Sequence, residues 1–335
     1  MTNYYFFSFI EWPQHRFTET SFPHSAQASI SPLIPIGAPQ HLFDSTTDPH
    51  PSEHSRTDIS PPSRINSRSL LINFLPNLNR MKTFVDSESG KVCCQVDEAD
   101  GDSVALLTHG YLSNKLSRTN SALIPLLNEK GISTIAFDLY GHGESEGNIE
   151  HLTVSRCVDG ALAVYDFARG RGYRKIALAA SSFSGPLALI SATKREFCAL
   201  ALRCPVFDGK KLWDSRLGPK GLAEWKSKKF ISPFGRPWHF EVYEDESKYD
   251  MPAIAGKVCA PSIVIHGDRD VTVPISQAES LVSSLKCEKK FVVVRGADHF
   301  FNEKKHFAEM LDQTSGWLIK FCKNPENSER VKKSQ

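Results

Sequence analysis

Several features that mark particular protein classes are missing from this chain of 335 residues. Its 40 basic and 38 acidic residues nearly cancel, so the charge balance implies neither a nucleic-acid partner nor an acidic membrane partner. No apolar run approaches the roughly 18 residues of a membrane-spanning helix. The 8 cysteines form no C-x-x-C pair and no histidine spacing typical of a zinc site, which indicates reduced thiols in a cytoplasmic protein.

The first 80 residues lack much of what a folded domain contains. They hold no lysine, no cysteine and 1 of the 20 glycines, but 10 of the 20 prolines. Such Pro- and Ser-rich sequence buries too little apolar surface to offset the entropy of ordering. We therefore expect 1–80 to be a disordered leader or an upstream extension of the gene, 81–323 to form the folded domain, and 324–335 to be a polar tail. A secretory signal fits poorly, because no basic segment precedes the apolar stretch at 4–10.

From residue 103 onward, strand-like apolar runs alternate with helical patterns. A first strand is predicted at 82–85. The strands of the alternating region are predicted at 103–108, 133–139, 175–180, 197–203, 262–266 and 290–295. The predicted helices are at 117–130, 153–169, 185–194, 275–285 and 300–322. This alternation predicts an α/β fold, in which helices cover both faces of a mostly parallel central sheet. Ligands bind such sheets at the carboxyl ends of the strands, so the irregular, aromatic segment at about 205–257 is expected to form a lid over the site.

A serine-rich turn follows the predicted strand at 175–180. A nucleophilic serine on a sharp strand-to-helix turn needs small residues two positions before and two positions after it, in the pattern G-x-S-x-G. Ser182 fits this requirement best, because Ala180 and Ser184 occupy the small positions. Ser184 or Ser181 as the nucleophile would place a proline or a phenylalanine at one of these positions instead.

Two later turns supply a base and an acid. A serine hydroxyl needs a base within hydrogen-bond reach, and His299 closes a Gly-Ala-Asp-His turn after the last predicted strand. The imidazole needs a carboxylate to fix its tautomer, and both Asp270 and Asp268 follow the strand at 262–266. We prefer Asp270, because the string His-Gly-x-x-Asp-x-x-Val-Pro places this acid on the loop after the strand, and we expect Asp268 to organise the turn.

A tetrahedral intermediate needs preorganised N–H donors for its oxyanion. Phe183 follows Ser182 at the start of a predicted helix and supplies one donor. The Thr-His-Gly-Tyr sequence at 108–111 follows an earlier predicted strand, so we assign the second donor to the N–H group of Tyr111.

Four segments of the chain carry a family resemblance, and the string Phe-Asp-x-x-Gly-His-Gly-x-Ser-x-Gly is its most specific part. The segments are 107–115, 137–147, 151–154 and 296–301. With these segments the chain resembles the α/β-hydrolase superfamily, and more narrowly its feruloyl/cinnamoyl esterase and acylglycerol-lipase-like group. The resemblance implies the α/β-hydrolase fold, no metal or other cofactor, a short lid and an acyl-serine intermediate on Ser182. The chain departs from this group at 180–185, where relatives usually carry Gly-His-Ser-Gln-Gly-Gly.

These residues together predict a serine hydrolase that cleaves a small-molecule carboxylic ester by acylation and deacylation. In this interpretation Ser182 attacks, His299 transfers protons and Asp270 orients His299. Alternatives with the same machinery are a thioesterase, an acylglycerol lipase and a peptidase. An alternative from another class is a non-catalytic protein that keeps the fold and binds a ligand in its pocket.

Overall fold

The computed structural model describes residues 80–233 and 235–323. The predictions for 1–79 and for the tail at 324–335 lie outside these residues. Strand β1 begins at Arg80, one residue before the predicted start of the domain. Within the described ranges, none of the helices has the length and apolar character needed to cross a membrane.

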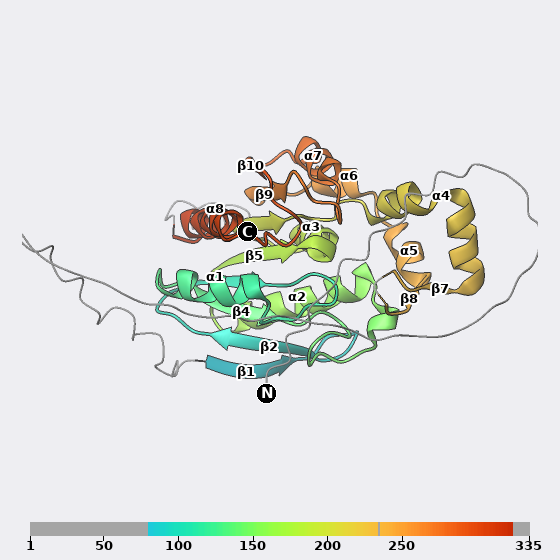
Figure 1. The fold of residues 1–335 in the computed structure, drawn as a ribbon. Coiled ribbons are helices and arrows are strands. Elements are labelled where there is room, and N and C mark those ends of the chain that lie inside the picture. The colour runs from blue at the N-terminus through green and yellow to red at the C-terminus, as the bar shows by residue number, and fades with distance from the viewer. Residues whose placement is uncertain (1–79, 234, 324–335) are drawn as a thin grey trace, which may run out of the picture. The chain divides into compact units, whose positions relative to one another are not determined.

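An eight-stranded, mostly parallel sheet forms the centre of the described domain (Figure 1). The strand order is β1-β2-β4-β3-β5-β6-β9-β10. Strand β2 runs antiparallel to both of its neighbours, and all the other neighbouring pairs are parallel. The strands are β1 (Arg80–Val85), β2 (Val92–Asp97), β3 (Ser103–Leu107), β4 (Ser133–Phe137), β5 (Lys175–Ser181), β6 (Ala199–Arg203), β9 (Ser262–Gly267) and β10 (Lys289–Val294).

Helices cover both faces of this sheet, as the alternating pattern predicts. Two of them pack together on one face, namely α1 (Arg118–Asn128) and α8 (Lys304–Lys323). The other face carries α2 (Val154–Gly170), α3 (Gly185–Ala192) and α7 (Ile275–Ser284).

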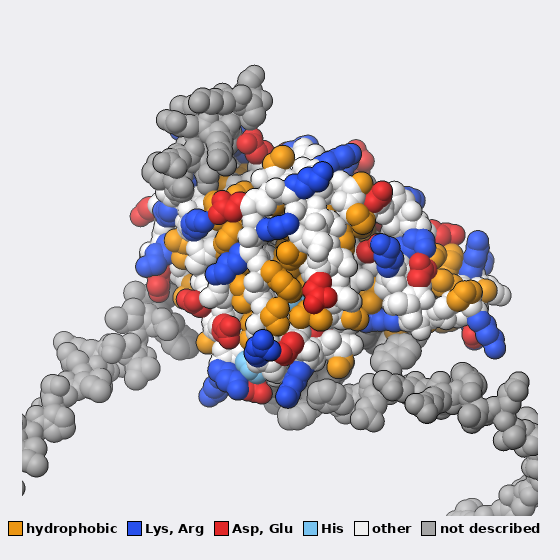
Figure 2. All heavy atoms as spheres, turned by 90° about the horizontal axis from the view of Figure 1, so that it is seen from above, with side chains coloured by type: hydrophobic (Ala, Val, Ile, Leu, Met, Phe, Trp, Pro, Cys, Tyr) orange, Lys and Arg blue, Asp and Glu red, His pale blue; other side chains and the backbone are white. Residues whose placement is uncertain are grey.

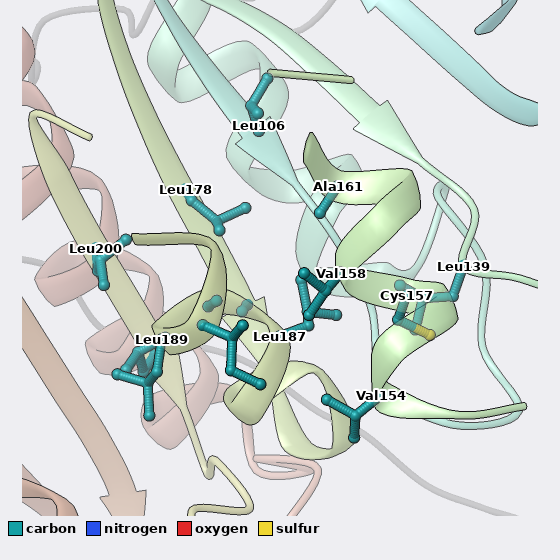
Figure 3. Packing of buried hydrophobic residues seen from close by; sticks show 14 of the residues in the cluster. Leu106, Leu139, Val154, Cys157, Val158, Ala161, Leu178, Leu187, Leu189 and Leu200 are labelled. Carbon is teal, nitrogen blue, oxygen red and sulfur yellow. The ribbon is translucent and has the colours of Figure 1, made fainter. Parts of the chain in front are cut away.

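The alternation of side chains along each strand divides the hydrophobic core into two layers. On β5, Leu178 belongs to the layer beneath α2 and α3, whereas its neighbour Ala177 belongs to the layer beneath α1 and α8. Figure 3 shows the first layer, in which Leu187 of α3 lies next to Val158 of α2. Burial of a leucine such as Leu178 or Leu187 contributes about 2 kcal/mol of hydrophobic free energy, and these contacts fix β5 and the turn that follows it.

The segment at 205–257 is not irregular, and this part of the prediction is wrong. It contains α4 (Gly209–Lys228), α5 (Glu241–Glu246), α6 (Met251–Ala255) and a two-stranded sheet of β7 (Phe230–Ile231) and β8 (Trp238–His239). The helical pattern of α4 is hidden in the sequence, because Gly218, with φ 60°, and Pro219 interrupt it. We call residues 205–257 the inserted segment.

The charged side chains of α4 lie on the protein surface. Figure 2 shows Lys and Arg side chains at its right, where α4 lies. Three lysines of this helix pair with nearby acids, and the pairs are Lys210–Asp214, Lys211–Asp208 and Lys228–Glu224. Exposed pairs of this kind contribute between about 0 and 1 kcal/mol each to stability. They therefore add little to the free energy that holds α4 in place.

Candidate active site

Ser182 stands on the sharp turn between β5 and α3. Its φ of 53° lies in the left-handed region, which costs a residue with a side chain roughly 1–3 kcal/mol. The chain turns closely here, since a Cβ atom on Gly185 would lie 2.2 Å from the carbonyl oxygen of Val206. Only glycine fits at position 185, and the strained turn places Ser182 at the carboxyl edge of the sheet.

The serine at 184 occupies the place where the G-x-S-x-G pattern has its second glycine. Its hydroxyl donates to the carbonyl oxygen of Ser181 at 2.8 Å and accepts from the Ser181 N–H group at 2.8 Å. Ser184 is fully buried, so both polar functions of the hydroxyl are used inside the turn. This pairing explains how the turn tolerates a serine at position 184. The Ser184 hydroxyl is not available to a catalytic base, whereas the Ser182 hydroxyl lies next to His299.

The structure brings Ser182, His299 and Asp270 together from three different turns, after β5, β10 and β9. The Oγ atom of Ser182 lies 3.0 Å from Nε2 of His299, and Nδ1 of His299 lies 2.6 Å from Oδ2 of Asp270. His299 and Asp270 are both buried. With Nδ1–H donating to Asp270, Nε2 of His299 is free to accept the Ser182 hydroxyl proton.

The Asp270 carboxylate is held by donors on both oxygens. Its Oδ1 accepts the N–H groups of Thr272 at 2.8 Å and Val273 at 2.7 Å. Burial opposes ionisation, but hydrogen bonds from His266 and His299 outweigh it and hold the pKa of Asp270 below its usual range. The group is therefore an anion beside His299, able to stabilise a positive imidazolium.

Asp268, the other acid of this loop, has a different partner. Its Oδ1 accepts the N–H group of Gly296 at 2.5 Å. Gly296 begins the turn that ends at His299, so Asp268 ties the loop after β9 to the loop after β10.

The loop at 108–111 passes directly beside the nucleophile candidate. A Cβ atom on Gly110 would lie 3.2 Å from Cβ of Ser182, so glycine permits this approach. Nδ1–H of His109 donates to the carbonyl oxygen of Gly110 at 2.8 Å, and its Nε2 accepts from the Leu139 N–H at 3.1 Å. Burial, together with nearby His142, lowers the pKa of His109 to about 4. A neutral imidazole thus braces the loop that carries Tyr111.

A second imidazole braces the same loop from the Gly-His-Gly segment. Nε2 of His142 accepts the Leu112 N–H at 3.1 Å, while its Nδ1–H donates to the carbonyl oxygen of Tyr140 at 3.0 Å. Burial lowers the pKa of His142, which favours the neutral ring that this pairing requires.

Lys115 and Asp138 complete this support. Nζ of Lys115 lies 2.7 Å from Oδ2 of Asp138, whose Oδ1 accepts the backbone N–H of Lys115 at 2.7 Å. The two residues belong to the segments 107–115 and 137–147, and the sequence alone suggested no role for either of them. Opposite charges within two segments that are otherwise largely apolar or glycine-rich are the signal that could have suggested a pair.

Aromatic side chains of the inserted segment reach the predicted oxyanion donors. The ring of Trp238 stacks on Tyr111, with centroids 4.2 Å apart, and lies 5.9 Å from the ring of Phe183. Trp238 also contacts Trp213, at 5.2 Å between centroids, and both indoles are buried. The inserted segment therefore packs on the residues that flank Ser182.

One group of described residues could hold a metal ion, and it overlaps this site. Ligand atoms of Cys204, His266 and Asp270, all buried, lie within 4.8 Å of one another. Asp270 is already engaged by His299 and by two backbone N–H groups, so a cation would have to take its carboxylate away from His299.

Comparison with known proteins finds relatives of the same fold. The family described as serine aminopeptidase, S33, matches residues 100–236. The structure of Est1E from Butyrivibrio proteoclasticus with bound ferulic acid is similar at a TM-score of 0.66 and 22% identity, over 72% of this chain and 100% of that one. The chain therefore has the α/β-hydrolase fold. The fold predicted from the sequence is thereby confirmed.

Three further proteins are similar to this chain. Mouse alpha/beta hydrolase domain-containing protein 10 has a TM-score of 0.64 and 20% identity, over 72% of this chain and 99% of that one. Monoacylglycerol lipase from Paleococcus ferrophilus has a TM-score of 0.53 and 20% identity, over 69% of this chain and 99% of that one. Human protein ABHD12B is 23% identical over 206 residues, 58% of this chain and 54% of that protein, so the chain spans about half of that relative's length.

Proposed function

We propose that this α/β-hydrolase is a serine esterase that cleaves a small-molecule carboxylic ester through an acyl-serine intermediate. The observation that carries the proposal is the hydrogen-bonded chain from Ser182 through His299 to Asp270. Its order along the sequence, serine then acid then histidine, is that of α/β-hydrolase triads.

In the acylation step, Oγ of Ser182 attacks the ester carbonyl carbon while Nε2 of His299 accepts the hydroxyl proton. The resulting imidazolium is stabilised by the buried carboxylate of Asp270. Collapse of the tetrahedral intermediate breaks the C–O bond to the alcohol, which leaves with the proton from His299. A water molecule, activated by the same imidazole, then hydrolyses the acyl-serine and restores Ser182.

The negative oxygen of both tetrahedral intermediates needs fixed donors, and we assign these to the N–H groups of Phe183 and Tyr111. Phe183 follows the nucleophile at the start of a helical turn, where N–H groups point outward without intrahelical partners. Tyr111 follows Gly110, whose close approach to Ser182 supports a donor at this place. Preorganised donors of this kind account for about 3–4 kcal/mol of transition-state stabilisation each.

The proposed substrate class is an ester with an apolar acyl or aromatic part. The rings of Tyr111, Phe183 and Trp238 pack together at the residues next to Ser182 and favour such a group over a charged one. The ferulic acid bound to Est1E, an aromatic acid in a protein of similar fold, supports including a feruloyl ester in the tests. The thioesterase, acylglycerol lipase and peptidase alternatives share the triad and differ only in the group that leaves.

We further propose that the protein works in the cytoplasm. All 8 cysteines are free thiols in the described residues, which suits a reducing compartment.

The test is a panel of p-nitrophenyl esters of increasing chain length, with methyl ferulate, an acyl thioester, a monoacylglycerol and an aminoacyl p-nitroanilide alongside. We expect turnover of at least one ester by the full-length protein, and a loss of about a thousandfold or more in Ser182→Ala, the scale known for triad knockouts. Preferential turnover of the anilide would identify a peptidase instead. No turnover of any substrate would favour the non-catalytic alternative.

A further inference from the structure

A second histidine, His266, lies beside the acid of the proposed triad. It is the fifth residue of β9, and its side chain is fully buried. Its Nε2 atom lies 2.9 Å from the carbonyl oxygen of Val273 and 3.3 Å from Oδ2 of Asp270. Both of these oxygens are acceptors, so Nε2 must carry the proton and donate it.

The contacts of Nε2 fix the orientation of the His266 ring. Nδ1 is buried and has no hydrogen-bond partner within the described part of the chain. A flip of the ring would place a carbon atom against the two oxygens and leave the carbonyl of Val273 unpaired. The observed orientation keeps the hydrogen bond to Val273, and leaving that carbonyl oxygen unpaired would cost about 1–3 kcal/mol.

His266 holds the acid and its loop at the same time. The N–H group of Val273 donates to Oδ1 of Asp270 at 2.7 Å, and the carbonyl oxygen of the same residue accepts from His266. The imidazole therefore closes a ring of hydrogen bonds through Val273 and the carboxylate. Oδ2, the carboxylate oxygen that His266 contacts at 3.3 Å, is also the oxygen that lies 2.6 Å from Nδ1 of His299.

We propose that His266 is a positioning residue for the hydrolytic reaction, acting through Asp270. It fixes the carboxylate in the plane in which Oδ2 meets His299, so that the base keeps the tautomer needed to accept the Ser182 proton. This inference rests on the proposed function, since a positioning role has meaning only if the triad reacts.

The first test compares two substitutions of His266 in the full-length protein. His266→Phe keeps an aromatic ring but removes the donor, whereas His266→Gln retains a side-chain N–H group near the position of Nε2. We expect His266→Phe to lower kcat for the best p-nitrophenyl ester about ten- to hundredfold, the usual scale for groups that orient a reacting side chain, with KM nearly unchanged. We expect kcat of His266→Gln to lie closer to that of the wild type.

A matched control separates positioning from stability. Ile263 is a fully buried residue of the same strand, and Ile263→Ala should lower the unfolding temperature while leaving kcat unchanged. Wild-type kcat in His266→Phe, or equal losses in both His266 variants and in Ile263→Ala, would overturn the proposal.

A second measurement on the wild type does not depend on how the variants fold or on turnover. In protein labelled with ¹⁵N-histidine, the NMR signals of the His266 ring are assigned by their absence from the spectrum of His266→Gln. We expect these signals to show a proton on Nε2 and none on Nδ1 at pH 7. The opposite tautomer would overturn the proposal. A wild type that shows the expected tautomer but hydrolyses nothing would refute the proposed function and leave the hydrogen-bond assignment of His266 intact, so the two failures are distinguishable.

Discussion

The indole of Trp238 lies parallel to the ring of Tyr111, with centroids 4.2 Å apart and planes 5° from parallel. Trp238 belongs to β8 of the inserted segment, and Tyr111 belongs to the loop beside Ser182. An aromatic stack contributes about 0.5–1.5 kcal/mol beyond the area that it buries. This pair therefore couples the position of the inserted segment to that of a proposed oxyanion donor.

Removal of the stacked indole should weaken catalysis. Because Tyr111 loses its packing partner, we expect Trp238→Ala to lower kcat/KM for the best ester about tenfold, which corresponds to about 1.4 kcal/mol of transition-state stabilisation. Trp238→Phe should retain most of the activity. Phe230, which is 47% exposed in the same segment, provides the control, since Phe230→Ala should leave kcat/KM unchanged. Equal kcat/KM values for Trp238→Ala and the wild type would show that the stack does not support the site.

The two acids of the loop after β9 should respond differently to neutralisation. Asp270→Asn removes the charge that faces Nδ1 of His299 and favours the wrong tautomer, so we expect kcat to fall by about four orders of magnitude. Asp268→Asn keeps an oxygen acceptor for the Gly296 N–H group and should cost less than tenfold. Steady-state kinetics on one ester checks both variants, and a larger loss for Asp268→Asn would reverse the assignment.

The sequence predicted the sheet well where its strands are buried on both faces. Such strands form continuous apolar runs, as in β5 and β9, and the polar residues that follow them point to the carboxyl edge of the sheet. No prediction was made for β2, whose Gln95 and Asp97 break its apolar run. The last helix begins at Lys304 rather than at residue 300, because the turn after His299 continues through Phe301, with φ 51°.

The candidate site was less accessible to sequence reasoning where residues act through contacts between distant segments. Ser182, Asp270 and His299 could be chosen, because each follows a strand in a fixed chain order. His266 shares the string His-Gly-x-x-Asp-x-x-Val-Pro with Asp270 and Val273, but the string alone does not show that its imidazole contacts both of them. His109 and His142 likewise depend on backbone groups about 30 residues away, which only the folded chain brings near.

A buried acid in the inserted segment should make stability depend on pH. Glu246 of α5 lies against the start of α4, where a Cβ atom on Gly209 would be 2.2 Å from its Oε1. Burial, with Asp245 and Asp208 nearby, raises the pKa of Glu246 from its ordinary value of 4.5 to about 8. The folded state then binds more protons than the unfolded state between these values, so its stability falls as the pH rises from about 4.5 to about 8.

Glu246→Gln should remove this contribution, because the amide has no charge to bury. We expect the unfolding temperature of the variant, relative to the wild type, to rise steadily from pH 5 to pH 8 and then level off. Thermal unfolding followed by circular dichroism across this range provides the measurement. A difference that stays constant with pH would show that Glu246 does not titrate in this window.

We also propose that the hydrolase domain begins at β1. A chain that starts at Arg80 should keep its unfolding temperature and its ester turnover, because Arg80 retains its pair with Asp97 at 2.7 Å and the pairing of β1 with β2 is complete. A chain that starts at Asp86 should be several degrees less stable, since it loses β1 and exposes the edge of β2. Loss of activity in the chain that starts at Arg80 would place the boundary earlier.

The central claim is that Ser182 is an activated nucleophile, and a fluorophosphonate probe tests it most directly. Only a serine whose proton is accepted by a nearby base reacts rapidly with such a reagent. We expect the full-length protein to be labelled stoichiometrically, with the adduct mapped by mass spectrometry to Ser182, and we expect the labelling rate to collapse in His299→Ala. Absence of labelling, or an adduct on Ser184, would contradict the account.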